Sequence, residues 1–168
     1  STNMENTVGY GMDHYTAEAE DTIRKVIGYD DADVHFTMAG TQTNLTAIGA
    51  FLRPHEAVIA ADTGHICVHE TGAIEATGHK IIHVPTKEGK LDPADIEAVM
   101  DQHCNEHWVK PKMIYISNLT ETGLCYSKAE LEALRDKCDQ YGLYIYLDGA
   151  RLAMALTQRD NDLTFADL

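Results

Sequence analysis

Clusters of basic residues are absent from this sequence. Its 168 residues include 13 Lys and Arg against 27 Asp and Glu, which gives a formal net charge of −14. Binding to nucleic acid or to an anionic membrane surface depends on clustered positive charge. The charge pattern therefore predicts no nucleic-acid partner and no membrane-surface partner. The acidity itself indicates solubility rather than a particular function.

Long hydrophobic runs are also absent. The apolar stretches Val58–Ala61 and Leu152–Leu156 are short, whereas a transmembrane helix needs about 20 such residues. The first residues, Ser1–Asn6, are polar and lack the pattern of a signal peptide. Four widely spaced cysteines form no Cys-x-x-Cys pair, which is typical of reduced thiols. We therefore expect a cytoplasmic protein.

The overall composition is that of a globular domain. Apolar residues make up 44% of the chain and charged residues 24%, so the chain can bury a core. The length suits one domain. No internal repeat, low-complexity tract or linker interrupts the sequence.

Short apolar runs alternate with helical patterns along the chain. The predicted strands are Val34–Met38, Ala57–Ala60, Lys80–Val84, Met113–Ser117 and Leu143–Leu147. The predicted helices are Tyr15–Ile27, Thr41–Leu52, Val68–Thr77, one from Asp92-Pro93 to about His107, and one from the Ser127 capping box to Gly142. This alternation predicts an α/β fold with a mostly parallel sheet and flanking helices. Ligands of such sheets bind beyond the carboxyl ends of the strands.

Gly40 and Thr41 follow the first predicted strand and begin a predicted helix. A helix N-terminus can bind an anion, and glycine allows close approach of a ligand to the backbone, so a phosphate fits here. The alternative is a tight turn in which Thr41 is simply the N-cap of the helix. The local sequence leaves both possibilities open.

Asp148 and Arg151 follow the most apolar predicted strand. A carboxylate at a buried strand end is expected to have a cationic partner. Arg151 is one candidate for that partner. The other possibility is that Asp148 faces a cationic ring nitrogen of a ligand, while Arg151 binds an anionic group.

A metal site is a further possibility near His65. His65, His69 and Glu70 are close in sequence, and Cys104 and His107 could contribute. However, the His-Glu-x-x-His order is absent. We therefore predict no metal ion, and the His65 imidazole could instead stack on a flat cofactor.

Four segments in a fixed order carry a family resemblance. They are Gly40–Asn44, His65–Ala73, Ser117–Gly123 and Asp148–Leu152. In this order they resemble the pyridoxal-phosphate-dependent threonine aldolases of the β-eliminating lyase group. The resemblance implies the large domain of fold type I, present here in incomplete form over residues 1–168, with the C-terminal small domain absent.

The resemblance also implies a role for each matching residue. Gly40 and Thr41 would hold the phosphate of pyridoxal 5'-phosphate, and His65 would stack on its ring. Asp148 would bond the protonated ring nitrogen, which keeps the cofactor an electron sink. Arg151 would bind the substrate carboxylate.

The implied reaction is cleavage of a β-hydroxy-α-amino acid such as threonine or allo-threonine into glycine and an aldehyde. A base must take the β-hydroxyl proton. His65, or a water that it holds, is the candidate, with Glu70 behind it. The predicted catalytic residues are therefore His65, Glu70 and Arg151.

One family feature is missing from the sequence. The lysine that forms a Schiff base with the cofactor lies, in the family, in a Gly-Gly-Thr-Lys type segment after Asp-Gly-Ala-Arg, and this chain ends at Leu168 without such a segment. We therefore expect an internal fragment that does not turn over substrate normally by itself, and that self-associates as a dimer or tetramer. The alternatives are another β-eliminating lyase, an aminotransferase-like enzyme, or a non-catalytic α/β ligand-binding module.

Overall fold

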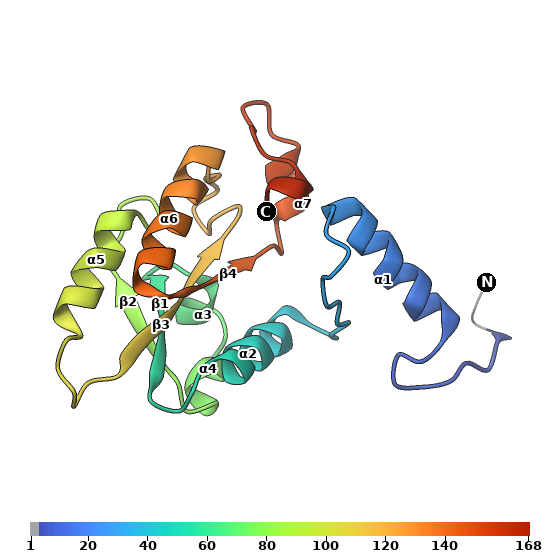
Figure 1. Ribbon diagram of the computed structural model, residues 1–168, viewed down its shortest axis with the longest axis horizontal. Helices are drawn as coiled ribbons and strands as arrows, with labels where there is room; N and C mark the ends of the chain where they lie inside the picture. The colour runs from blue at the N-terminus through green and yellow to red at the C-terminus, as the bar shows by residue number, and fades with distance from the viewer. Residues whose placement is uncertain (1–3) are drawn as a thin grey trace. The chain divides into compact units, whose positions relative to one another are not determined.

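The computed structural model describes residues 4–168 (Figure 1). The chain divides into two compact units. One unit extends to Phe36 and includes Leu163–Leu168, and the other is Thr37–Asp162. All the residues predicted to form a site belong to the second unit.

The first unit is built on helix α1 (His14–Ile27). Asp13 caps its N-terminus by accepting a hydrogen bond of 3.0 Å from the Thr16 backbone N–H. Gly28 ends the helix in the left-handed region, with φ 72°. The short helix η2 (Phe165–Asp167) contacts α1. The predicted helix over residues 15–27 is thus confirmed.

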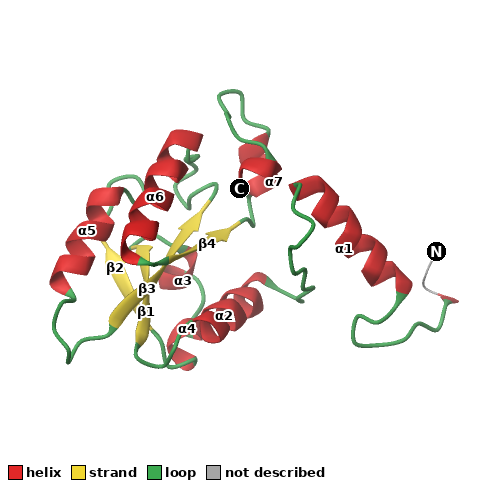
Figure 2. Ribbon diagram, viewed as in Figure 1, coloured by secondary structure: helices red, strands yellow, loops and turns green. Residues whose placement is uncertain are grey.

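The second unit contains a parallel sheet. Its strands are β1 (Glu56–Ala61), β2 (Lys80–Val84), β3 (Lys110–Ser117) and β4 (Tyr144–Asp148). Within residues 4–168 they form one four-stranded sheet in the order β2-β1-β3-β4 (Figure 2). All three neighbouring pairs are parallel. The predicted α/β class and four of the five predicted strands are confirmed.

Helices cover both faces of this sheet. They are α2 (Gly40–Phe51), α3 (His65–Val68), α4 (Ala73–Ala76), α5 (Pro93–Gln102) and α6 (Lys128–Tyr141). A further short helix, α7 (Leu152–Leu156), follows β4. On one face, Ile96 of α5 and Leu134 of α6 pack in a core with Ile59 of β1. On the other face, Ile48 of α2 and Ile74 of α4 pack in a second core.

The fifth predicted strand, Val34–Met38, is wrong. These residues form an extended loop, with Phe36 57% exposed and Met38 95% exposed. A β-strand requires a neighbour to satisfy its backbone N–H and C=O groups. Among the described residues no strand pairs with this segment, so its β propensity does not produce a strand.

The predicted helix Val68–Thr77 is also wrong as one element. It is replaced by α3 and α4, which are separated by a break at His69–Gly72. Thr71 and Gly72 have φ values of 51° and 81°. Two successive residues with positive φ cannot continue a right-handed helix.

The predicted helix from Asp92 begins as expected but ends early. Asp92 accepts hydrogen bonds from the backbone N–H groups of Ala94 and Asp95. The helix ends at Gln102 rather than near His107. The Asn105 side chain accepts a hydrogen bond of 2.9 Å from the backbone N–H of His107, and this local bond favours a turn over a helix.

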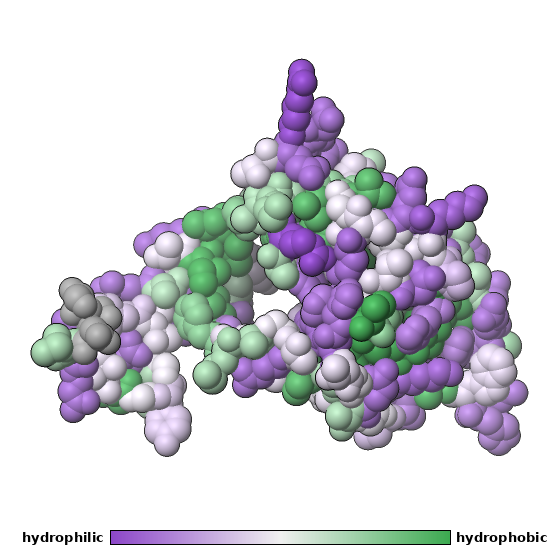
Figure 3. Space-filling model, turned by 180° about the vertical axis from the view of Figure 1, so that it is seen from behind, coloured by the Kyte–Doolittle hydropathy of each residue, from purple (hydrophilic) through white to green (hydrophobic). Residues whose placement is uncertain are grey.

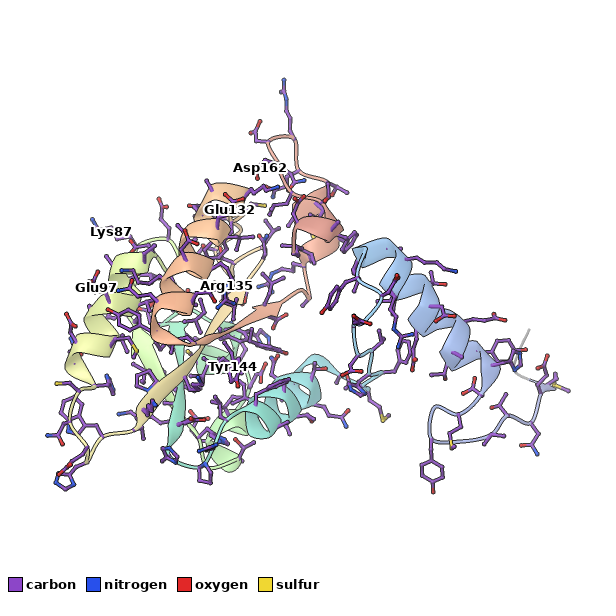
Figure 4. All side chains as sticks on the ribbon, viewed as in Figure 1. Lys87, Glu97, Glu132, Arg135, Tyr144 and Asp162 are labelled. Atoms are coloured by element: carbon purple, nitrogen blue, oxygen red, sulfur yellow. The ribbon has the colours of Figure 1, made fainter. Side chains whose placement is uncertain are left out.

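Helix α6 follows its sequence signals closely. Ser127 and Glu130 form the predicted capping box, and Gly142 ends the helix with φ 64°. Lys137 of α6 forms an ion pair of 3.3 Å with Glu97 of α5, which is labelled in Figure 4. The two helices are therefore joined at their surface as well as through the core below.

The left-handed backbone at Gly142 gives a stability prediction. A Cβ at this position would have 3.8 Å to the nearest atom, so Gly142→Ala is not sterically blocked, but its φ of 64° is strained. We expect this variant to lose about 1 kcal/mol of unfolding free energy. Gly49→Ala is the matched control, because Gly49 lies inside α2 without a positive φ, and it should gain about 0.5 kcal/mol. Urea denaturation measures both, and equal stability of the two variants would contradict the prediction.

The face of the molecule drawn in Figure 3 carries both polar and apolar residues. Large apolar side chains are exposed at Phe51 and Val68, at 61% and 56%. Within the described residues, no helix is both long and apolar enough to span a bilayer.

Candidate functional site

The candidate site lies at the carboxyl edge of the sheet, where β4 ends in Asp148. Side chains alternate between the faces along a strand, so Tyr144, Tyr146 and Asp148 share one face of β4. Tyr146 pairs in register with Tyr115 of β3, and Tyr115 belongs to the core beneath α2 and α4. Asp148 is therefore presented on the face that α2, α3 and α4 cover.

Asp148 is held by hydrogen bonds rather than by an ion pair. Its Oδ2 accepts from the Tyr115 hydroxyl at 2.5 Å, and its Oδ1 accepts from the Ala150 backbone N–H at 2.9 Å. Burial, and then the bond to Asp148, raise the pKa of Tyr115, so the phenol remains a donor. Within the part of the chain described, no basic side chain pairs with Asp148. Of the two possibilities that the sequence left open, the one in which Arg151 is the partner of Asp148 is therefore wrong.

Arg151 instead contacts the loop after β3. Its Nη2 forms an ion pair of 2.8 Å with Glu121, and its Nε and Nη2 donate to the Leu119 carbonyl at 3.1 and 3.0 Å. Ser117 donates to the same Glu121 oxygen at 3.0 Å. The Nη1 group of Arg151 has no hydrogen-bond acceptor among residues 4–168. The guanidinium is thus fixed in position with one nitrogen still available to a ligand.

His65 lies at the start of α3, directly after β1. Gly64 makes the turn, and a Cβ there would lie 2.9 Å from the Ala61 carbonyl oxygen, which explains the glycine. His65 Nδ1 lies 2.7 Å from Glu70 Oε1. The His65 side chain is 36% exposed, whereas that of Glu70 is fully buried. The structure thus places Glu70 next to His65, on the side of Nδ1, whereas the family resemblance implied only that Glu70 lies behind it.

The other residues considered for a metal site do not assemble with His65. The ring of His69 lies 5.3 Å from that of His65, measured between centroids. Cys104 and His107 lie in the exposed turn after α5. Across residues 4–168, no three His, Cys, Asp or Glu side chains are arranged to hold a metal ion.

Two residues that sequence reasoning missed complete the environment of Glu70. The Asn44 amide Nδ2 donates to Glu70 Oε1 at 2.5 Å, and the Tyr146 hydroxyl donates to Asn44 Oδ1 at 2.7 Å. Asn44 is 2% exposed and Glu70 is 3% exposed. The alternation along β4 could have indicated Tyr146, which lies two residues before Asp148. Asn44 carried no signal beyond its place in the Gly40–Asn44 segment.

Gly40 and Thr41 form the first residues of α2. The N-cap is Ala39, which makes no side-chain capping bond, so the alternative in which Thr41 serves as the N-cap is wrong. A Cβ built on Gly40 would meet no atom within 4 Å. The helix N-terminus is therefore open in the region where the sequence predicted a phosphate, and the backbone N–H groups of its first turn lack a capping side chain.

The parallel sheet and its flanking helices match the large domain of the fold type I enzymes that use pyridoxal phosphate. The chain belongs to the beta-eliminating lyase family, whose model matches residues 2–164. Members of this family use pyridoxal 5'-phosphate.

Three relatives show the range of similarity. The low specificity L-threonine aldolase of Pseudomonas aeruginosa is 34% identical over 148 residues, which cover 87% of this chain and 42% of the relative. The solved threonine aldolase of Leishmania major is 54% identical, with a TM-score of 0.97, over 99% of this chain and 48% of that one. An archaeal alanine:glyoxylate aminotransferase, at 19% identity and a TM-score of 0.66 over 90% of this chain and 37% of that one, shares the fold. The chain thus spans less than half the length of these relatives.

The residues present fit pyridoxal phosphate. Among residues 4–168, the Asp148 carboxylate accepts hydrogen bonds from the Tyr115 hydroxyl and the Ala150 N–H, whereas a carboxylate has about four acceptor positions. It also lacks a cationic partner among the described residues, so a protonated ring nitrogen would complement its charge. No lysine within residues 4–168 hydrogen-bonds to His65, Glu70 or Asp148.

Proposed function

We propose that the protein is a pyridoxal-phosphate-dependent aldolase. It would cleave L-threonine, allo-threonine or a related β-hydroxy-α-amino acid to glycine and an aldehyde. The observation that carries this proposal is the 54% identity with the threonine aldolase of Leishmania major over 99% of the chain. The His65–Glu70 contact of 2.7 Å supports it, because the reaction needs a base.

The cofactor would be held by residues of three elements. Gly40 and Thr41 at the open start of α2 would bind its phosphate, His65 would lie against its ring, and Asp148 would accept a hydrogen bond from its ring nitrogen. Bound there, pyridoxal phosphate supplies an electron sink for the bond that breaks at Cα. Asp148 serves this chemistry by keeping a negative charge beside the ring nitrogen.

The substrate would be oriented by Arg151 and deprotonated by His65. Arg151 Nη1 would bind the α-carboxylate, while Glu121 and the Leu119 carbonyl keep the guanidinium in place. His65 Nδ1 contacts Glu70, which leaves Nε2 to take the β-hydroxyl proton as the Cα–Cβ bond breaks. Glu70 would stabilise the imidazolium that results.

The wider setting is also part of the proposal. Residues 1–168 would form part of the large domain of a cytoplasmic enzyme, in keeping with the free state of all four cysteines. We propose a dimer or tetramer, supported by exposed apolar side chains such as Phe51 and Val68. Sedimentation of the intact protein tests this, and a compact monomer would contradict it.

A product assay tests the proposed reaction. The intact protein, supplied with pyridoxal phosphate, should convert L-threonine or L-allo-threonine to equal amounts of glycine and acetaldehyde. Acetaldehyde is measured by coupled reduction with NADH, and glycine by amino-acid analysis. Omission of the cofactor from cofactor-stripped protein should remove the activity.

Two results would overturn the proposed reaction. Binding of the cofactor with release of ammonia or a keto acid instead of an aldehyde would indicate another β-eliminating lyase or an aminotransferase-like enzyme. Cofactor binding without any product from a panel of amino acids would indicate a non-catalytic ligand-binding module.

A further inference from the structure

We propose that Asn44 and Tyr146 are positioning residues that fix the Glu70 carboxylate and, through it, the tautomer and direction of the His65 ring. This inference rests on the proposed function for the role of His65 as the base. The hydrogen bonds themselves involve only residues of this chain and need no cofactor. The network joins residues from four parts of the second unit: Asn44 of α2, His65 of α3, Glu70 of the α3–α4 connection, and Tyr146 of β4. It therefore connects segments near the beginning and the end of this unit in sequence.

The direction of each hydrogen bond follows from the chemistry of the groups. A tyrosine hydroxyl that points at Asn44 Oδ1 donates to it, so the amide nitrogen of Asn44 faces Glu70 and donates. Glu70 Oε1 accepts from Asn44 and lies against His65 Nδ1. Since an ionised carboxylate only accepts, Nδ1 carries the proton. The neutral ring then has its lone pair on Nε2.

Burial makes the Asn44 contact necessary. The Glu70 side chain is fully buried, and its second oxygen, Oε2, is buried without a hydrogen-bond partner among the described residues. Oε1 therefore carries all the hydrogen bonds that this carboxylate receives within residues 4–168. Without Asn44, the partly exposed His65 ring would be the only donor, and a buried carboxylate with one donor is free to rotate away.

Tyr146 in turn holds the Asn44 amide in one orientation. An Asn side chain can rotate by half a turn and exchange its oxygen and nitrogen. With the Tyr146 hydroxyl donating at 2.7 Å, only one orientation places Oδ1 toward the tyrosine and Nδ2 toward Glu70. The ring of Tyr146 is itself packed against Tyr115 at 5.6 Å between centroids. The position of the Tyr146 hydroxyl therefore determines the orientation of the Asn44 amide, and through it the hydrogen bonds of Glu70.

The test is proton and nitrogen NMR of the His65 ring in the intact protein without cofactor. The Nδ1–H proton of His65 should be protected from exchange and shifted downfield, and a His65→Gln variant assigns it. We expect Tyr146→Phe and Asn44→Leu to increase its exchange rate about fivefold or more, the ratio that corresponds to loss of one neutral hydrogen bond. Tyr144→Phe is the matched control (Figure 4), because Tyr144 lies on the same face of β4 and its hydroxyl makes no hydrogen bond within the described residues.

Kinetics of the loaded enzyme give a second readout. Tyr146→Phe should lower kcat about fivefold with little change in KM, since the base is misplaced while the substrate carboxylate is still bound. An unchanged His65 proton in both Tyr146→Phe and Asn44→Leu would overturn the inference, whatever the activity. A changed proton in a protein that forms no aldehyde would leave the positioning roles in place and overturn only the proposed function.

Discussion

Asp148→Asn is expected to lower kcat for threonine cleavage by about 100- to 1,000-fold, the usual loss when one preorganised electrostatic group is removed. The asparagine keeps the shape of the side chain, and its oxygen can still accept from the Tyr115 hydroxyl, which lies 2.5 Å from the carboxylate. The negative charge is lost, and the amide nitrogen that replaces Oδ1 cannot accept the hydrogen bond from the Ala150 backbone N–H. The ring nitrogen of the cofactor would then no longer be favoured in its protonated form. The measurement is steady-state release of acetaldehyde at saturating cofactor.

The control for this variant is Asp139→Asn. Asp139 lies on the exposed surface of α6, where it pairs with Arg135 at 2.6 Å, and surface pairs of this kind contribute little. Its removal should leave kcat unchanged. Equilibrium dialysis with pyridoxal phosphate distinguishes a loss of cofactor binding in Asp148→Asn from a loss of kcat with the cofactor bound. A folded variant that binds cofactor normally and keeps full activity would contradict the role given to Asp148.

Local sequence signals predicted the elements whose ends are determined by neighbouring residues. The capping box at Ser127 and Glu130 and the left-handed Gly142 define α6 through contacts within a few positions along the chain. The four strands were equally clear, because runs of mainly apolar residues are typical of a parallel sheet covered on both sides. Such features need little knowledge of the tertiary structure.

The wrong predictions have tertiary or backbone causes. The segment Val34–Met38 has the residues of a strand, but a strand exists only beside another strand. The positive φ values at Thr71 and Gly72 that separate α3 from α4 leave almost no trace in the sequence, since Thr rarely adopts them. The sequence pattern reports the local preference for strand or helix. In these two segments the tertiary structure and the backbone conformation override that preference.

In the candidate site, too, the sequence predicted the position of residues along the fold but not their contacts with distant residues. Strand ends placed His65 and Asp148 at the correct edge of the sheet, because the order of strands and helices determines that edge. Partners could not be assigned, since they come from distant parts of the chain. Asn44 and Tyr146 are 102 positions apart, and Arg151 contacts Glu121 rather than its neighbour Asp148.

His65→Asn is the sharpest test of the base, and we expect kcat to fall about 100- to 10,000-fold. The Asn amide nitrogen takes a place close to that of Nδ1, so the bond to Glu70, 2.7 Å in the present structure, can be preserved. What disappears is Nε2, the atom that would accept the β-hydroxyl proton. The ring that would lie against the cofactor disappears with it, so a loss of this size is assigned to proton transfer only where folding and cofactor binding, measured by equilibrium dialysis, are both retained.

The neighbouring histidine provides the matched control for this loss. His69 is the same residue type, lies four positions along the chain with its ring 5.3 Å from that of His65, and is exposed without a hydrogen bond from its side chain among the described residues. His69→Asn should keep kcat within about twofold, as expected for a surface change. If His69→Asn instead caused the large loss and His65→Asn did not, the base would be His69, and the bonds that run from Tyr146 to Glu70 would serve the fold rather than the reaction.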